Sequence, residues 1–167
     1  PPARAAGMDY IFIIQGEGRG HMTQAIALSE ILEGAGHKVK EVYLGTSPQR
    51  PVPSFVKDAF DDRLQTFRSP NFIRTKDRKG INMPATWVYN GIRIPGYLAN
   101  IVRLARHIRH SDADAVVNFY DLLGGLAYRI SFTAKPMYTI SHHFYFEHPE
   151  FHWPSTFSLQ KPLLRLY

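Results

Sequence analysis

Apolar and polar positions in the first part of the chain follow two alternating patterns. Residues 9–15 form an almost continuous apolar run that is followed at once by glycines, as is typical of a parallel strand buried on both faces. A stripe at helical spacing comes next, and residues 38–44 then form a second strand. The stripe consists of Leu28, Ile31, Leu32 and Ala35, and Gly34 and Gly36 end the helix. The chain is therefore predicted to begin with a β-α-β unit.

The same alternation continues less regularly to about residue 140. Residues 69–91 show no sustained period, which is typical of a functional or mobile loop. The other segments predict a short helix at 54–60, an irregular strand at 63–67, a helix with apolar positions from Leu98 to Ile108, a strand at 114–119, a helix at 122–132 and a strand at 136–140. Strands that alternate with helices indicate an α/β fold with a doubly wound parallel sheet and right-handed crossovers.

Composition narrows the class of protein. The 167 residues are enough for one domain, and the lack of cysteine excludes disulfides, thiolate nucleophiles and Cys-ligated zinc. A formal net charge of +6 favours anionic partners without choosing among them. No apolar run approaches a bilayer span, and the N-terminus lacks a signal peptide, so we expect a cytoplasmic protein.

The two ends of the chain carry expectations of their own. Residues 1–7 are predicted to be disordered or foreign to the native chain, with Met8 as the native start. The chain stops at Tyr167 on Leu-Arg-Leu-Tyr, without a helix cap or a polar tail. We therefore expect residues 8–167 to be the first domain of a longer protein.

The strongest chemical signal is the glycine-rich turn between the first strand and the first helix, Gln15-Gly-Glu-Gly-Arg-Gly-His-Met-Thr-Gln24. Glycines let backbone N–H groups approach a ligand, and the helix N-terminus attracts an anion. A dinucleotide fingerprint would need glycine where His21 stands and an acidic residue ending the second strand, and a P-loop would need lysine after Gly20. Both motifs fail, and the turn instead delivers an imidazole to the carboxyl edge of the sheet.

This turn resembles the N-terminal domain of GT-B glycosyltransferases. The match lies in Gly16-Glu-Gly-Arg-Gly-His21, then Thr23 to Leu28, then Gly36-His-Lys-Val39, and it is similar to the family 28 type that includes the peptidoglycan N-acetylglucosaminyl transferase. The resemblance implies one Rossmann-like half of a two-domain enzyme. This half would bind mainly the acceptor, and a C-terminal half absent from this chain would bind most of the nucleotide-sugar donor, for example a UDP-sugar.

The resemblance also implies roles for individual residues. His21 would be the general base of an inverting, metal-independent transfer, a role that suits a pKa near ~6.5. In some relatives a carboxylate after a later strand holds the catalytic imidazole, and Asp121 is the candidate here, with Glu17 as the alternative. The candidates for contact with substrate or phosphate are Gly16, Glu17, Gly18, Arg19, Gly20, Thr23, His142 and His143.

Other interpretations of these candidate residues stay open. His21 could cap or brace a helix, and Asp121 is a common type of N-cap. His142 and His143 belong to an aromatic segment after the predicted strand at 136–140, which suits a substrate-lining loop because it opens at the carboxyl edge of the sheet. Metal binding by these histidines is the alternative, although their spacing matches no zincin pattern. No cofactor and no metal are expected. The resemblance further implies a lipid-linked acceptor and peripheral contact with the inner face of the membrane, and residues 72–79 have a suitable apolar and basic composition, although no family motif matches them.

Two other functions compete with the transferase. A non-catalytic module could hold an anion or a membrane surface through the turn and the arginines of the helix at 98–108. A nucleotide-sugar epimerase is a third hypothesis, weakened by the defective dinucleotide fingerprint. Nucleic acid is not favoured, because an arginine-bearing helix face is more often simply solvated.

Overall fold

A computed structural model describes residues 7–48, 50–77 and 79–141. Its strands are β1 (Asp9–Ile14), β2 (Lys38–Thr46), β3 (Leu64–Arg68), β4 (Ala115–Phe119) and β5 (Met137–Thr139). Its helices are α1 (Arg19–Gly34), α2 (Ser54–Phe60), α3 (Met83–Gly91), α4 (Ile94–His110) and α5 (Leu122–Ser131), with a 3₁₀ turn at Asp61–Arg63. Every strand and helix predicted up to residue 140 is present, with ends shifted by a few residues.

The strands form one parallel sheet in the order β3-β2-β1-β4-β5. The chain moves outward from β1 through β2 to β3, and then returns across the sheet to place β4 on the other side of β1. This is the strand order of a Rossmann-like, doubly wound α/β fold. The order reverses between β1 and β4, where folds of this type form their ligand crevice at the carboxyl ends of the strands.

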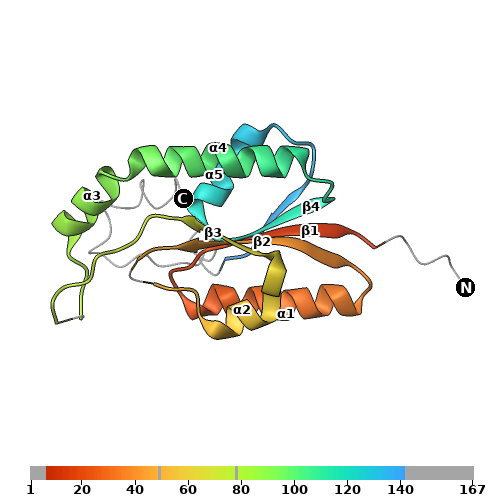
Figure 1. Ribbon diagram of the computed structural model, residues 1–167, viewed down its shortest axis with the longest axis horizontal. Coiled ribbons are helices and arrows are strands. Elements are labelled where there is room, and N and C mark those ends of the chain that lie inside the picture. Colours follow the sequence, from red (N-terminus) through yellow and green to blue (C-terminus); the bar gives the residue numbers. More distant parts are fainter. Residues whose placement is uncertain (1–6, 49, 78, 142–167) are drawn as a thin grey trace, which may run out of the picture.

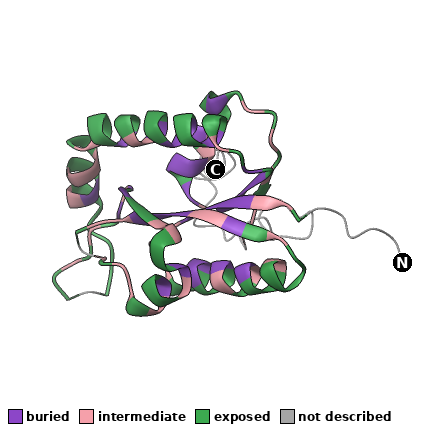
Figure 2. Cartoon of the chain, turned by 45° about the vertical axis from the view of Figure 1, so that its right-hand side comes forward, coloured by how far each residue is buried: buried purple, intermediate pink, exposed green. Residues whose placement is uncertain are grey.

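Helices cover both faces of the sheet. Figure 1 shows α1 and α2 on one face and α4 and α5 on the other, and α3 lies beyond the carboxyl ends of the strands. The central strand is buried on both faces, with Phe12 and Ile14 in the core beneath α1 and Ile11 and Ile13 in the core beneath α4 and α5. In Figure 2 the purple of buried residues runs through the inner strands, and the outward sides of the helices are exposed.

The predicted helix stripes are partly wrong. In α1 the buried residues are His21, Met22, Ala25 and Ser29, whereas Ile31 is 67% exposed and Ala35 is exposed as well. The face that packs on the sheet therefore includes a histidine and a serine, which a search for apolar periodicity passes over. In α4, Leu98 and Val102 are likewise exposed, and the buried face is Tyr97, Ile101, Leu104, Ala105 and Ile108.

The segment predicted to lack periodicity, residues 69–91, contains the helix α3. The Asn82 side chain caps it by accepting a hydrogen bond from the backbone N–H of Ala85 at 3.1 Å, and a proline lies in its first turn. Both are helix-start signals that are independent of hydrophobic period. Only Thr86 among its residues is buried, which explains why no apolar stripe marks this helix in the sequence.

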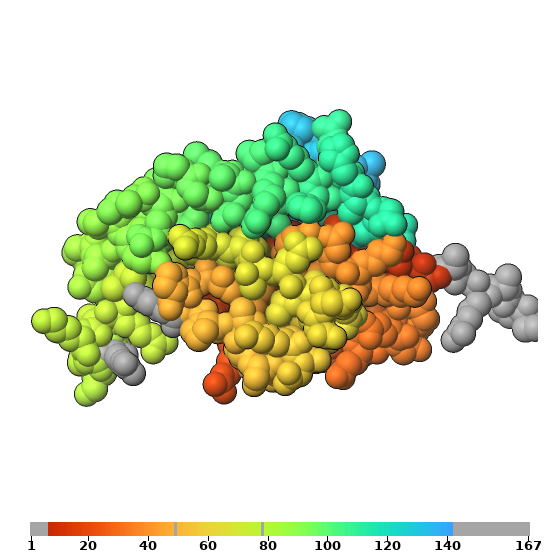
Figure 3. All heavy atoms as spheres, viewed as in Figure 1, coloured from red at the N-terminus to blue at the C-terminus, as the bar shows by residue number. Residues whose placement is uncertain are grey.

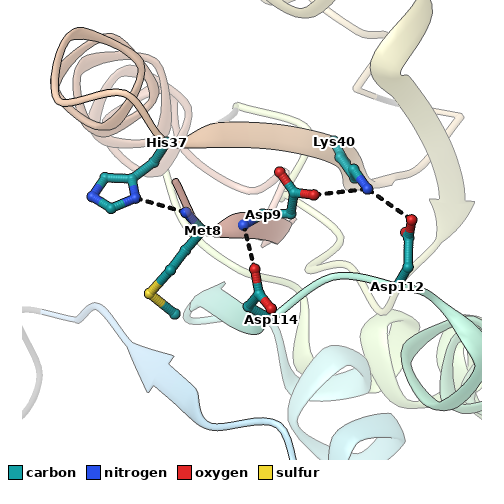
Figure 4. Close-up of polar contacts among 6 residues, drawn as sticks. All are labelled: Met8, Asp9, His37, Lys40, Asp112 and Asp114. Atoms are coloured by element: carbon teal, nitrogen blue, oxygen red, sulfur yellow. Dashed lines mark hydrogen bonds and ion pairs between the residues drawn. The ribbon is translucent and has the colours of Figure 1, made fainter. Parts of the chain in front are cut away.

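A polar cluster ties the strands together at the amino end of the sheet, opposite the glycine-rich turn (Figure 4). The Lys40 ammonium lies 2.8 Å from carboxylate oxygens of both Asp9 and Asp112, and the backbone N–H of Asp9 donates to Asp114 Oδ2 at 2.8 Å. These contacts join β1 and β2 to the segment that enters β4. Within the described residues, no helix is long and apolar enough to cross a membrane.

Candidate functional site

The glycine-rich turn lies against the end of β4, at the point where the strand order reverses. The backbone N–H of Gln15 donates to the carbonyl of Phe119 at 3.2 Å, which extends the β1–β4 ladder into the turn. The His21 ring then stacks on Tyr120, with centroids 6.0 Å apart and planes 28° apart. The turn after β1 and the turn after β4 are therefore in contact at this edge of the sheet.

Glycine stands at three positions of the turn for different structural reasons. A Cβ on Gly16 would lie 1.7 Å from the carbonyl oxygen of Gly45, so the close approach of the turn to the end of β2 requires glycine there. Gly18 is the N-cap of α1 in extended conformation, and Gly20 has nothing within 4 Å of its Cβ position. None of the three has a positive φ. At Gly18 and Gly20 the glycines leave open space beside the helix N-terminus.

His21 is a buried residue in the first turn of α1, with 7% of its surface exposed. Its neighbour Tyr120 is held at φ 57°, in the left-handed region that residues other than glycine rarely adopt. Such a conformation costs about 1–3 kcal/mol and persists where the surroundings impose it, often at functional sites. The imidazole therefore packs against a strained turn.

Asp121 follows Tyr120 and is buried as the N-cap of α5. Its Oδ1 accepts from the backbone N–H of Gly124 at 2.8 Å, and its own N–H donates to Asn118 Oδ1 at 3.0 Å. Burial raises the pKa of Asp121 to about 7, against the opposing effect of the backbone hydrogen bonds that its carboxylate accepts. At neutral pH this carboxyl is consequently divided between its acid and base forms.

A small cavity of about 80 Å³ opens beside Asp121, with room for a few waters or one functional group of a ligand. A Cβ on Gly45 would lie 2.9 Å from Asp121 Oδ2 and 2.8 Å from Ser69 Oγ, so glycine at the end of β2 makes room for both side chains. Of the described residues, Glu17 lines this cavity together with Asp121 and Ser69, and His21 does not.

Two asparagines of the site were missed by the sequence analysis. Asn71 and Asn90 both line the cavity, and they exchange backbone and amide hydrogen bonds of 3.1 and 2.9 Å. Asn71 also donates to Ser47 Oγ at 2.9 Å, and the Tyr97 hydroxyl donates to Asn90 Oδ1 at 3.0 Å. Through these contacts the loop before α3 is fastened over the carboxyl edge. Asparagines in a segment without period carry no local signal that would have identified them.

The other predicted site residues in the glycine-rich turn and α1 differ in exposure and in their contacts. Glu17 Oε1 accepts from the backbone N–H of Phe72 at 3.2 Å, and the Arg50 side chain donates to the Glu17 carbonyl. Arg19 is exposed, and the exposed Thr23 donates its hydroxyl to the carbonyl of Gly20 at 2.9 Å. The contacts of Glu17 and Asp121 thus go to backbone N–H groups, and whether either carboxylate orients His21 stays a prediction.

Some expectations fall outside the described residues. His142 and His143 lie in the segment 142–167, which is not described. The prediction for residues 1–7 also falls outside the described residues, except at Gly7. Across 7–48, 50–77 and 79–141 there is no group of three or more His, Asp or Glu side chains placed to hold a metal ion.

Comparison with known proteins addresses the fold alone. No family model matches the chain, and no curated protein matches it in sequence. Among solved structures, the C-terminal domain of a hydrogenase from Pyrococcus furiosus is similar, with a TM-score of 0.53, 11% identity, and coverage of 84% of this chain and 95% of that one. MurG from Acinetobacter baumannii is also similar, with a TM-score of 0.46, 16% identity, and coverage of 80% of this chain and 34% of that one.

Proposed function

We propose that this chain is the acceptor-side domain of an inverting glycosyltransferase that moves a sugar from a nucleotide-sugar to an acceptor hydroxyl. The observation that carries the proposal is the position of the Gly16-Glu-Gly-Arg-Gly-His21 turn. The motif that resembles GT-B transferases follows β1 and packs on the end of β4, at the ligand-binding edge of a Rossmann-like sheet.

In this reaction the acceptor oxygen attacks the anomeric carbon and the bond to the nucleoside diphosphate breaks. The acceptor proton passes to a ring nitrogen of His21, and the leaving group takes the bonding electron pair. Backbone N–H groups at the start of α1, beside the open positions of Gly18 and Gly20, would stabilise phosphate charge. The C-terminal half that binds the donor is part of the proposal.

Asp121 enters the proposal as a positioning residue. By capping α5 and bonding Asn118 it fixes the strained turn at Tyr120, and Tyr120 in turn packs on the imidazole. Asparagine can keep the cap, whereas alanine cannot. We therefore expect Asp121→Asn to retain turnover and Asp121→Ala to lose much of it, a rescue that a directly reacting carboxylate would not give.

The test is turnover by protein expressed from the complete reading frame, followed as nucleoside diphosphate release from a panel of nucleotide-sugars in the presence of a membrane lipid extract. His21→Ala should lower kcat by about 10²–10⁴-fold while circular dichroism stays unchanged. His110→Ala, at the far end of α4, is the matched control and should turn over normally. Wild-type turnover by His21→Ala would refute the assignment of the base.

A second candidate, contact with a membrane surface, is favoured by one observation. Trp87, Val88, Ile92 and Ile94, which we call the α3 patch, are between 53 and 73% exposed, and Ile92 and Ile94 flank Arg93 in the chain. Exposed apolar side chains beside a cation suit the headgroup region of an anionic bilayer. The patch lies beyond the carboxyl edge of the sheet (Figure 1), close to the candidate site but outside the residues 72–79 expected from the sequence.

Co-sedimentation with phosphatidylserine-containing vesicles tests this candidate. Trp87→Ser and Ile92→Ser should each weaken binding several-fold. Ile31→Ser removes an equally exposed apolar side chain from α1, on the opposite face of the sheet, and should leave binding unchanged. Equal losses in all three variants, or no binding by the wild type, would refute a membrane-docking patch.

A further inference from the structure

A second and larger cavity lies between the ends of β2 and β3 and the first half of α4. Its volume is about 600 Å³, and the residues that line it include Arg68, Arg93, Arg103, Asn100 and Tyr97. Figure 3 shows the elements concerned side by side on one face of the molecule, α4 in green above the yellow atoms of β3. This cavity is separate from the one beside Asp121 and contains no residue of the glycine-rich turn.

The cavity is strongly cationic. No carboxylate is among the described residues that line it. The ion pairs within the described ranges are made by Lys40 and Arg63, so none of the three cavity arginines has a carboxylate partner there. Like charges on residues that line one hollow repel one another, and an anion relieves that repulsion.

Several contacts hold these arginines in place. Arg93 stacks 3.7 Å from the centroid of the Tyr89 ring and donates to the Tyr89 carbonyl at 2.9 Å. Arg103 donates to Asn100 Oδ1 at 3.3 Å, and Asn100 donates to the carbonyl of Arg68 at 2.9 Å. Because these contacts restrain the side chains of Arg93 and Arg103 before a ligand arrives, less conformational entropy is lost on binding.

The electrostatic influence of the arginines reaches the neighbouring tyrosines. Burial raises the pKa of Tyr97, and the charges of Arg93 and Arg68 oppose that shift. Burial likewise raises the pKa of Tyr43, with Arg103 in opposition. Since Tyr97 lines the cavity, the charges of Arg93 and Arg68 act at its wall.

We propose that this cavity binds the phosphoryl or diphosphoryl group of a small ligand. A phosphate monoester carries about −1.5 to −2 charges at neutral pH, which matches three arginines better than a single carboxylate does. Guanidinium groups bind phosphate oxygens through paired hydrogen bonds, and the volume leaves room for an organic group beside the phosphate. The proposal does not depend on the glycosyltransferase assignment.

One hydrogen bond joins this anion site to the cavity beside Asp121. The Tyr97 hydroxyl, whose residue lines the anion site, donates to Asn90 Oδ1, and Asn90 lines the other cavity. A ligand bound through the arginines therefore lies next to the carboxyl edge of the sheet.

The experiment titrates inorganic pyrophosphate into the chain at constant ionic strength, with calorimetry and amide chemical shifts as readouts. Arg93→Gln and Arg103→Gln should each raise Kd by about tenfold or more. Arg109→Gln is the matched control, because it removes the same charge from the same helix outside the cavity. If Arg93→Gln fails to fold, Arg103→Gln, whose side chain is exposed, carries the test.

Two probes distinguish a soluble phosphate ligand from a lipid headgroup. Binding of pyrophosphate that is lost in the cavity variants alone indicates a soluble ligand. Binding to phosphatidic acid vesicles but not to pyrophosphate indicates a lipid headgroup, if that binding is again lost in the cavity variants alone. Either result supports a phosphoryl site. An equal loss in Arg109→Gln, or no binding of either probe at millimolar concentration, would overturn it.

Discussion

The buried carboxyl of Asp121 makes stability depend on pH in a way that a single substitution can isolate. Its pKa is raised from 3.8 to about 7 by burial, so between these values the unfolded chain releases a proton that the folded chain keeps. Ionisation of the unfolded state favours unfolding, and stability therefore falls as pH rises through this window. Below the window both states are protonated, and above it both are ionised.

The magnitude follows from the cited shift. Each pH unit inside the window lowers the free energy of unfolding by about 1.4 kcal/mol. Near pH 7 the folded state begins to lose the proton as well, so the total loss between about pH 5 and pH 7 is about 2 kcal/mol. Asp121→Asn has nearly the same shape, can accept the cap hydrogen bond from Gly124, and does not titrate. The difference in free energy of unfolding between the wild type and this variant should change by that amount.

Urea unfolding of both proteins across this pH range measures the effect. Other titrating groups contribute equally to both proteins and cancel in the difference, provided that they are not coupled to Asp121. A difference that stays constant with pH would show that the carboxyl is ionised in the folded state, and the argument from burial would then be wrong.

Three further outcomes are expected from the structure. Gly16→Ala should lower the free energy of unfolding by more than about 2 kcal/mol because its Cβ would lie 1.7 Å from a backbone oxygen, whereas Gly20→Ala, in open space, should cost nothing; equal melting temperatures would contradict this. Asn82→Ala should cost about 1 kcal/mol and reduce hydrogen-exchange protection in α3, and unchanged protection would mean that the cap is not needed. The hydrogen bond from Lys40 lowers the pKa of Asp112, so its contribution is present above the ordinary value of 3.8 and is lost as pH falls; Asp112→Asn should be less stable than wild type at neutral pH and equal in strong acid, as thermal melts can check.

The fold could be predicted from the sequence because its strands are strongly marked. Residues 10–14 and 115–119 are buried on both faces, so their apolar runs stand out, and the glycine-rich turn fixes where the first helix begins. The helix α3 was not predicted because Thr86 is the one buried residue among Met83–Gly91, so no apolar stripe marks it, and its start signals are a cap and a proline.

The candidate site could be predicted only in part. His21 and Asp121 were identifiable because each follows a strand whose end lies at the same edge of the sheet. Ser69, Asn71 and Asn90 were not, because a polar residue in a loop becomes part of a site only when the fold brings that loop over the edge. The titration of Asp121 depends on burial in the same way, and no local pattern reports it.

The strand order also has a consequence for how the protein is made. A ribosome delivers β1, α1 and β2 first, and these neighbours can pair while the rest of the chain is still being synthesised. The strand that completes the other side of β1 comes much later, as the contact between Asp9 and Asp114, 105 residues apart, illustrates. Until β4 arrives, the central strand has one open edge and His21 has no turn to pack against. The site that would bind ligand is thus among the last parts of this sheet to form, and a nascent chain cannot bind through it before the turn at Tyr120 has left the ribosome.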